Sequence, residues 1–117
     1  MTGREDTVIG DAGNAGAKNY AATHKGSAAY LEIVRGGHVS FTSCEHYTPT
    51  YGNGIGPSSS LTRPGETYEP LPIEEQHAAI NSYGLAFLNA HLKGDAESKA
   101  YLGKNHFDPG EVVWECF

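Results

Sequence analysis

The stretch AAYLEIV, residues 28–34, constrains the fold of this chain more than any other segment. Its aromatic and β-branched side chains predict a strand, and Gly36 and Gly37 mark its end. Apart from Glu32, apolar side chains fall on both faces of this strand. A strand of this kind needs cover on two sides, as in a parallel sheet flanked by helices. The sequence therefore predicts an α/β fold.

Length and charge narrow the classes of function. The chain has 117 residues, which fit one domain, and its 8 basic and 14 acidic residues give a net charge of -6. This acidity argues against a nucleic-acid partner, which requires a basic surface. No apolar run reaches the roughly 18 residues of a transmembrane helix, so we expect no membrane span. The segment MTGREDTVIG lacks the apolar core of a signal peptide.

Residues 73–93 carry the strongest helical pattern in the chain. Pro72 suits the entry of this helix, and Gly94 suits its exit. Large side chains recur at spacings of three, four and seven, which predicts one stripe facing the core. The members of this stripe are Ile73, His77, Ile80, Phe87, Leu88 and His91.

The remaining segments give weaker signals. Val8 and Ile9 resemble the tail of a strand, and Asp11 is expected to cap a short helix that reaches residues 20–24. Residues 95–102 are expected to add helical turns, and the apolar tail 111–117 is expected to be extended and docked.

The segment 44–72 is rich in Gly, Pro, Ser and Thr and shows no helical or alternating period. A loop of this length is uncommon in a compact domain unless it is functional or disordered. Its tyrosines and aliphatic side chains favour an ordered loop that packs on the body. One strand and one long helix cannot cover each other on every apolar face. We therefore expect residues 1–117 to form a single partial domain whose sheet continues in another segment.

The order of these features resembles the C-terminal third of an α/β-hydrolase. A Gly-x-x-Asp motif, residues 3–6, precedes a helix, the strand 28–34, the sequence GGH with His38, and the helix 73–93. The corresponding order is acid loop, helix, last sheet strand, histidine loop, long closing helix and docked tail. Within this superfamily the chain is most similar to dienelactone-hydrolase-like esterases, with platelet-activating-factor acetylhydrolases and polyester-degrading cutinases as relatives. The resemblance covers residues 1 to about 102.

The resemblance implies that Asp6 is the acid and His38 the base of a Ser-His-Asp triad. A general base presents one ring nitrogen to the nucleophile while a carboxylate orients the other, and groups that face a ligand lie at the carboxyl ends of the strands. Gly36 and Gly37 are expected to let the chain turn sharply, so that the imidazole leaves the sheet plane. Glu5 and Asp11 are alternative acids. The competing interpretation is a turn histidine and a solvated loop carboxylate, both without chemistry.

The family also needs a serine within G-x-S-x-G, upstream of the acid. Residues 56–60, GPSSS, lack the second glycine and follow the histidine in chain order. We therefore expect the serine on an upstream segment of the same hydrolase and expect this chain alone to be inactive. Its expected partners are that upstream segment, which bears the nucleophile, and an ester substrate. The resemblance implies no cofactor and no metal. Two alternatives remain: a non-catalytic structural or assembly subunit that retains a hydrolase scaffold, or a small-molecule binding module that uses the loop tyrosines.

Two cysteines, Cys44 and Cys116, lie far apart in the sequence. They lack the close pairing of a zinc site, which leaves two buried thiols or one disulfide that closes a long loop. The resemblance favours the disulfide and a secreted protein with its signal peptide upstream, because secreted esterases of this group often carry a C-terminal bridge. The other histidines are expected to serve packing (His77, His91) or to lie on the surface (His24, His46, His106).

Overall fold

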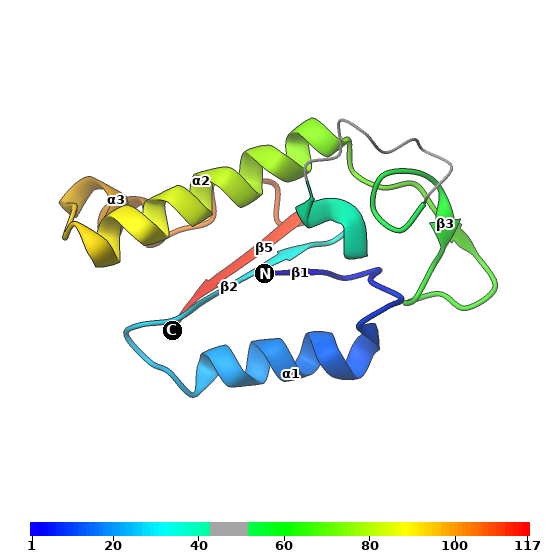
Figure 1. Ribbon diagram of the computed structural model, residues 1–117, viewed down its shortest axis with the longest axis horizontal. Helices are drawn as coiled ribbons and strands as arrows, with labels where there is room; N and C mark the ends of the chain where they lie inside the picture. Colours follow the sequence, from blue (N-terminus) through cyan, green and yellow to red (C-terminus); the bar gives the residue numbers. More distant parts are fainter. Residues whose placement is uncertain (43–51) are drawn as a thin grey trace.

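The computed structural model describes residues 1–42 and 52–117, and it shows a small α/β protein in which a mixed sheet lies between helices (Figure 1). In chain order the elements are β1 (Thr2–Gly3), α1 (Gly10–Ala22), β2 (Ala29–Ile33), the 3₁₀ turn η1 (His38–Phe41), β3 (Ser58–Ser59), β4 (Thr67–Tyr68), α2 (Ile73–Leu92), α3 (Ala96–Leu102) and β5 (Val112–Cys116). The α/β class predicted from residues 28–34 is thus what the structure shows.

Within the described residues, the main sheet has the order β1-β2-β5. Strand β1 pairs with β2 in parallel, with Thr2 opposite Glu32, whereas β5 runs antiparallel to β2, with Trp114 opposite Leu31. Strands β3 and β4 form a separate antiparallel pair within the predicted loop, which is therefore partly regular. The parallel arrangement holds for β1 and β2, and β5 makes the sheet mixed.

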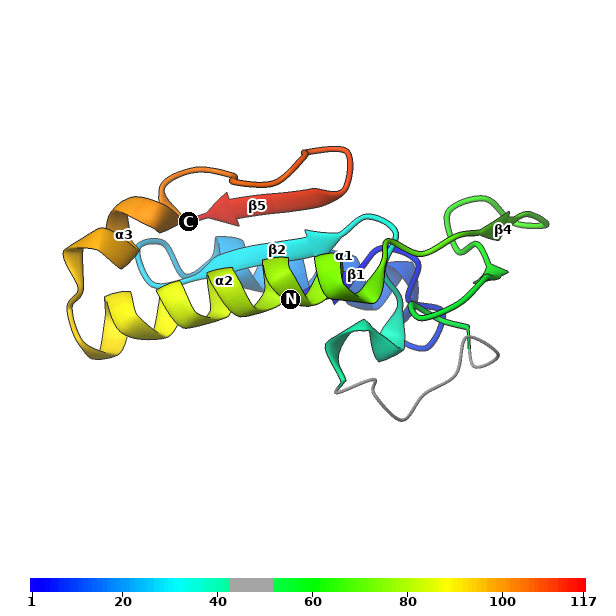
Figure 2. The same ribbon diagram turned by 90° about the horizontal axis from the view of Figure 1, so that it is seen from above.

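Helices cover both faces of the sheet, with α1 on one side and α2 on the other (Figures 1 and 2). On the α2 side, Leu31 and Ile33 are at most 1% exposed and belong to an apolar core with Ala79 and Tyr83 of α2. Trp114 of β5 stacks on Tyr83, with ring centroids 4.1 Å apart. Burial of this apolar area supplies most of the stabilisation that holds α2 to the sheet.

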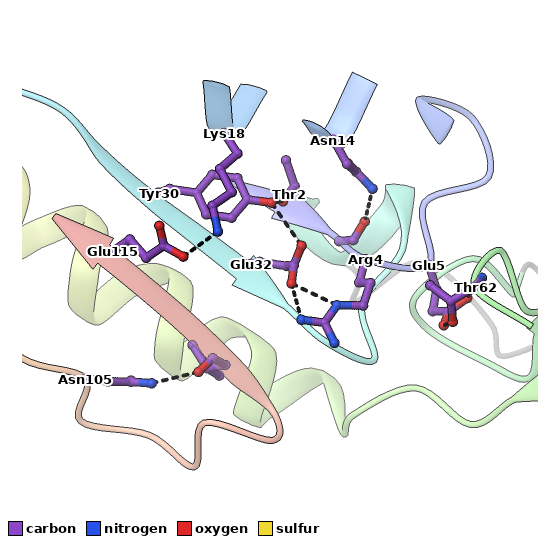
Figure 3. Close-up of polar contacts among 12 residues, drawn as sticks. Thr2, Arg4, Glu5, Asn14, Lys18, Tyr30, Glu32, Thr62, Asn105 and Glu115 are labelled. Carbon is purple, nitrogen blue, oxygen red and sulfur yellow. Dashed lines mark hydrogen bonds and ion pairs between the residues drawn. The ribbon is translucent and has the colours of Figure 1, made fainter. Parts of the chain in front are cut away.

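The opposite face, under α1, is held by polar contacts instead (Figure 3). Lys18 of α1 pairs with Glu115 of β5, and Asn14 of α1 donates to the Gly3 carbonyl oxygen at 3.0 Å. On β2, Glu32 accepts from Tyr30 at 2.9 Å and pairs with Arg4. Burial raises the pKa of Tyr30 to about 12, so its hydroxyl remains a donor at any physiological pH. The face expected to be apolar therefore carries a hydrogen-bonded layer.

The predicted core stripe of α2 is correct in part. Ile80 and Phe87 are partly buried and pack against the core, but the fully buried face is turned from the predicted one. The buried residues of α2 are Gln76, Ala79, Tyr83, Ala86 and Ala90. Of the predicted stripe, Leu88 is 53% exposed and His91 is also exposed. Small alanine side chains allow the helix to pack closely on the sheet, so packing distance decides the buried face more than the size of the apolar side chains.

The N-terminal segment also differs from the prediction. The first strand consists of Thr2–Gly3, whereas Val8 and Ile9 lie exposed in the turn before α1. Asp11 is exposed in the first turn of α1, where its charge complements the helix dipole, but no side chain caps this helix.

The C-terminal tail is extended and docked, as predicted, and its last residues lie away from the histidine turn. Because β5 is antiparallel to β2, Cys116 lies opposite Ala29, at the end of the sheet remote from η1 (Figures 1 and 2). Cys116 is exposed. Cys44 lies outside the described residues, so the disulfide stays a prediction.

Candidate acid–histidine site

The parallel pairing of β1 and β2 places their carboxyl ends at the same edge of the sheet. Asp6 follows β1, and His38 begins η1 after β2. Oδ2 of Asp6 lies 3.0 Å from Nδ1 of His38. Asp6 and His38 are far apart in the sequence, but they meet because the segments that follow β1 and β2 leave the sheet at the same edge.

Asp6 is held in one orientation by the backbone around it. Its Oδ1 accepts the N–H groups of Val8 and Ile9, both at 2.9 Å, and its carbonyl oxygen accepts the N–H of Gly10 at 2.9 Å. The residue is only 4% exposed. These bonds occupy Oδ1 and leave Oδ2 directed at His38, so the carboxylate is oriented before any ligand arrives.

The imidazole of His38 lies at the surface, with 46% of its side chain exposed. An ionised carboxylate only accepts hydrogen bonds, so the neutral ring carries its proton on Nδ1, facing Asp6. Nε2 is then the basic nitrogen. No serine hydroxyl among residues 1–42 and 52–117 is hydrogen-bonded to this ring: Ser40, Ser58 and Ser60 form other contacts.

Gly36 allows the sharp turn that was predicted. Its N–H donates to the Ile33 carbonyl oxygen at 3.1 Å, and a Cβ on Gly36 would lie 2.7 Å from Ile33 Cβ. Gly37 has a different role: it is extended at φ -132°, and a Cβ there would lie 2.6 Å from Asn53 Oδ1. The absence of that Cβ lets the segment around Asn53 approach the histidine turn closely.

Glu5, one of the alternative acids, binds residues 60–62 and not His38. Its carboxylate accepts from Ser60 Oγ at 2.9 Å, Leu61 N–H at 2.5 Å and Thr62 N–H at 3.2 Å. It also accepts from Thr62 Oγ1 at 2.5 Å, and Glu5 and Thr62 lie side by side in Figure 3. Burial raises the pKa of Glu5, but these hydrogen bonds outweigh it and leave the pKa below its ordinary value. Asp11, the other alternative, is exposed on α1. Of the three predicted acids, Asp6 is the one that contacts His38.

The remaining histidines lie elsewhere. His24 contacts the Tyr20 carbonyl oxygen, His106 stacks on Tyr101, and His91 contacts the Phe87 ring. His77 is half-buried on α2, and His46 lies outside the described residues. Within the part of the chain that the structure describes, no group of three His, Cys, Asp or Glu side chains is arranged to hold a metal ion.

Sequence reasoning missed Asn53 and Gln76, which support the histidine turn. Asn53 has a left-handed φ of +49° and accepts the His38 N–H. Gln76 of α2 is fully buried and binds the Gly54 carbonyl oxygen. The asparagine between two glycines, GNG, is a signal for left-handed backbone, but the sequence gives no sign of which segment it contacts.

Comparisons with protein-family models, with curated proteins and with solved structures found no match for this chain. Among the described helices, none combines the length and apolar character needed to cross a membrane.

Proposed function

We propose that this chain supplies the acid and the base of a Ser-His-Asp carboxylic-ester hydrolase, as the C-terminal part of an α/β-hydrolase domain. The observation that supports the proposal is the 3.0 Å contact between Asp6 Oδ2 and His38 Nδ1 at the carboxyl ends of adjacent parallel strands. A buried, oriented carboxylate beside an accessible imidazole is the arrangement that a general base requires.

In this role His38 Nε2 accepts the proton of the attacking serine hydroxyl, and the serine oxygen bonds to the ester carbonyl carbon. The resulting imidazolium returns its proton to the departing alcohol, which leaves an acyl-serine. Water then attacks the acyl-serine, with Nε2 again taking and returning one proton, and releases the acid. Asp6 keeps the Nδ1–H tautomer and stabilises the imidazolium throughout.

The serine and the oxyanion donors come from the proposed partner, the upstream nucleophile-bearing portion of the same hydrolase. The exposed surface beside β1 is consistent with such a partner. Met1 is 52% exposed, and an apolar hollow of about 280 Å³ is lined by Met1, Leu31, Gly84 and Leu88. A secreted location with a Cys44–Cys116 disulfide belongs to the same proposal.

Paired acid variants test the assignment. The tagged chain is isolated from the cells that produce it, together with the serine-bearing partner, and hydrolysis of p-nitrophenyl butyrate is measured. Asp6→Asn is expected to lower kcat about 10⁴-fold, because the amide no longer fixes the required tautomer. The control Asp11→Asn alters an exposed acid on α1 and is expected to keep full activity.

The partner is identified by a fluorophosphonate probe, which labels activated serines. A labelled peptide within G-x-S-x-G supports the proposal. Undiminished hydrolysis by Asp6→Asn would overturn it. Co-purification of a partner that takes no label, with no ester hydrolysis, would favour the non-catalytic assembly subunit.

A further inference from the structure

The histidine turn rests on a segment that is distant in sequence, residues 53–54. The His38 N–H donates to Asn53 Oδ1 at 3.0 Å, and the Val39 N–H donates to the Asn53 carbonyl oxygen at 3.0 Å. These are the first N–H groups of η1, which its own helical bonds leave unsatisfied. Asn53 thus binds the residue that carries the imidazole and the one after it.

Asn53 is itself fixed from two other directions. Its N–H donates to Ser58 Oγ at 3.1 Å. The neighbouring Gly54 carbonyl oxygen accepts from Gln76 Nε2 at 2.8 Å, and Gln76 is fully buried in α2. Helix α2 therefore anchors the segment that holds the histidine, even though α2 itself does not contact the imidazole ring in any described hydrogen bond.

The backbone at Asn53 also suits this role. Its φ of +49° is the left-handed region, which asparagine tolerates better than most residues because its short amide can bond locally. The absence of a Cβ at Gly37 lets Asn53 Oδ1 come within reach of the His38 N–H. Two independent features, the glycine and the left-handed asparagine, thus bring the same amide oxygen to the histidine turn.

We infer that Asn53 is a positioning residue for His38. Its amide oxygen fixes the backbone of residue 38, and this holds the imidazole at hydrogen-bond distance from Asp6. The inference rests on the proposed function for its catalytic meaning, but the positioning itself is a structural property of the 117-residue chain. When the backbone of residue 38 is released, the ring is expected to leave Asp6 for part of the time and to populate the other neutral tautomer.

Two substitutions separate the amide oxygen from the backbone conformation. Asn53→Gly keeps the left-handed conformation without strain and removes the acceptor. Asn53→Asp keeps an oxygen acceptor at the same position and tolerates the same φ. If Asn53 were needed only for folding, both variants would show the wild-type tautomer of His38 whenever they are folded. Circular dichroism checks that each variant is folded.

The readout is the tautomer of His38 in the ¹⁵N-labelled chain at about pH 8.5, roughly two units above the ordinary histidine pKa. Long-range ¹H–¹⁵N correlations distinguish the Nδ1–H from the Nε2–H form, and His38→Ala assigns the signal. Wild type and Asn53→Asp are expected to show mainly the Nδ1–H form, and Asn53→Gly a mixture of the two forms. An unchanged Nδ1–H form in folded Asn53→Gly would overturn the inference.

Ester hydrolysis by the partnered chain, which is the chain isolated together with its serine-bearing partner, separates this inference from the proposed function. Asn53→Gly is expected to lower kcat about 10-fold to 100-fold with little change in KM, because a misplaced base affects the chemical step. Rescue by Asn53→Asp supports positioning. A tautomer shift with no esterase activity in wild type would leave the positioning role standing and refute the esterase. Full activity of Asn53→Gly beside an active wild type would refute the positioning role.

Discussion

The buried carboxylate of Glu5 gives a prediction about stability that can be worked out from its contacts. Oε2 accepts from Ser60 Oγ, Leu61 N–H and Thr62 N–H, and Oε1 accepts from Thr62 Oγ1. In Glu5→Gln the amide oxygen can keep the three bonds of Oε2, while the Thr62 hydroxyl turns to accept from the new NH₂ group. The packing is preserved, and what is lost is the charge.

Hydrogen bonds to a charged group contribute about 1 kcal/mol more than neutral ones. Four such bonds become neutral in Glu5→Gln, and the desolvation cost of the charge is removed at the same time. The balance predicts that Glu5→Gln lowers the free energy of unfolding by about 1–3 kcal/mol at neutral pH. Because the folded-state pKa of Glu5 lies below its ordinary 4.5, this stabilisation is present above about pH 4.5 and is lost as the pH falls through the folded value.

Urea unfolding followed by circular dichroism measures the difference at about pH 7 and about pH 3. The destabilisation of Glu5→Gln is expected at the higher pH and should shrink at the lower pH, which lies below the ordinary pKa of a glutamate carboxyl. Glu74→Gln, which changes an exposed acid in the first turn of α2, is the matched control and should cost only a few tenths of a kcal/mol. Equal stability of Glu5→Gln and wild type at neutral pH, or a difference that does not shrink in acid, would refute this reasoning.

Two further predictions concern the glycines and the cysteines. Gly37→Ala is expected to destabilise the chain by about 2 kcal/mol or more, because its Cβ would overlap Asn53. Gly16→Ala in α1 meets open space and should stabilise the chain by about 0.5–1 kcal/mol. Thermal unfolding compares the two variants, and equal melting temperatures would contradict the packing argument. Thiol labelling of the unreduced, denatured protein tests the bridge between Cys44 and Cys116. The proposal expects no reactive thiol, and two per chain would exclude the disulfide.

The sequence was most informative where a single local rule decides the structure. The β-forming run at 28–34 predicted β2, and Pro72 and Gly94 bracketed α2, since propensity and chain breakers act over a few residues. The buried face of α2 was predicted only in part, because it depends on how closely the helix approaches a sheet assembled from distant segments. Asn53 was missed for the same reason: its contact with His38 spans 15 positions and depends on a loop path that no local pattern encodes.

The pair of Asp6 and His38 lies between these cases. A strand end that carries an acid and a second strand end that carries a histidine were visible in the sequence, and the parallel pairing of the two strands brings them together. The resemblance indicated Asp6 rather than Glu5 or Asp11, but which of the three contacts His38 depends on side-chain directions in a turn, and these the sequence does not encode. The sequence pattern did not show that the Glu5 side chain turns toward Thr62, away from the imidazole.

The most direct test of the account is the specific activity of the partnered chain with His38→Ala, measured beside His91→Ala. His91 lies exposed on α2 and contacts only the Phe87 ring among the described aromatic contacts, so its loss should leave ester hydrolysis unchanged. His38→Ala removes the proposed general base and should lower kcat about 10⁴-fold or more, with the complex still assembled. Hydrolysis that persists in His38→Ala at the rate of the control would contradict the assignment of His38 and Asp6 as the base and acid of a serine esterase.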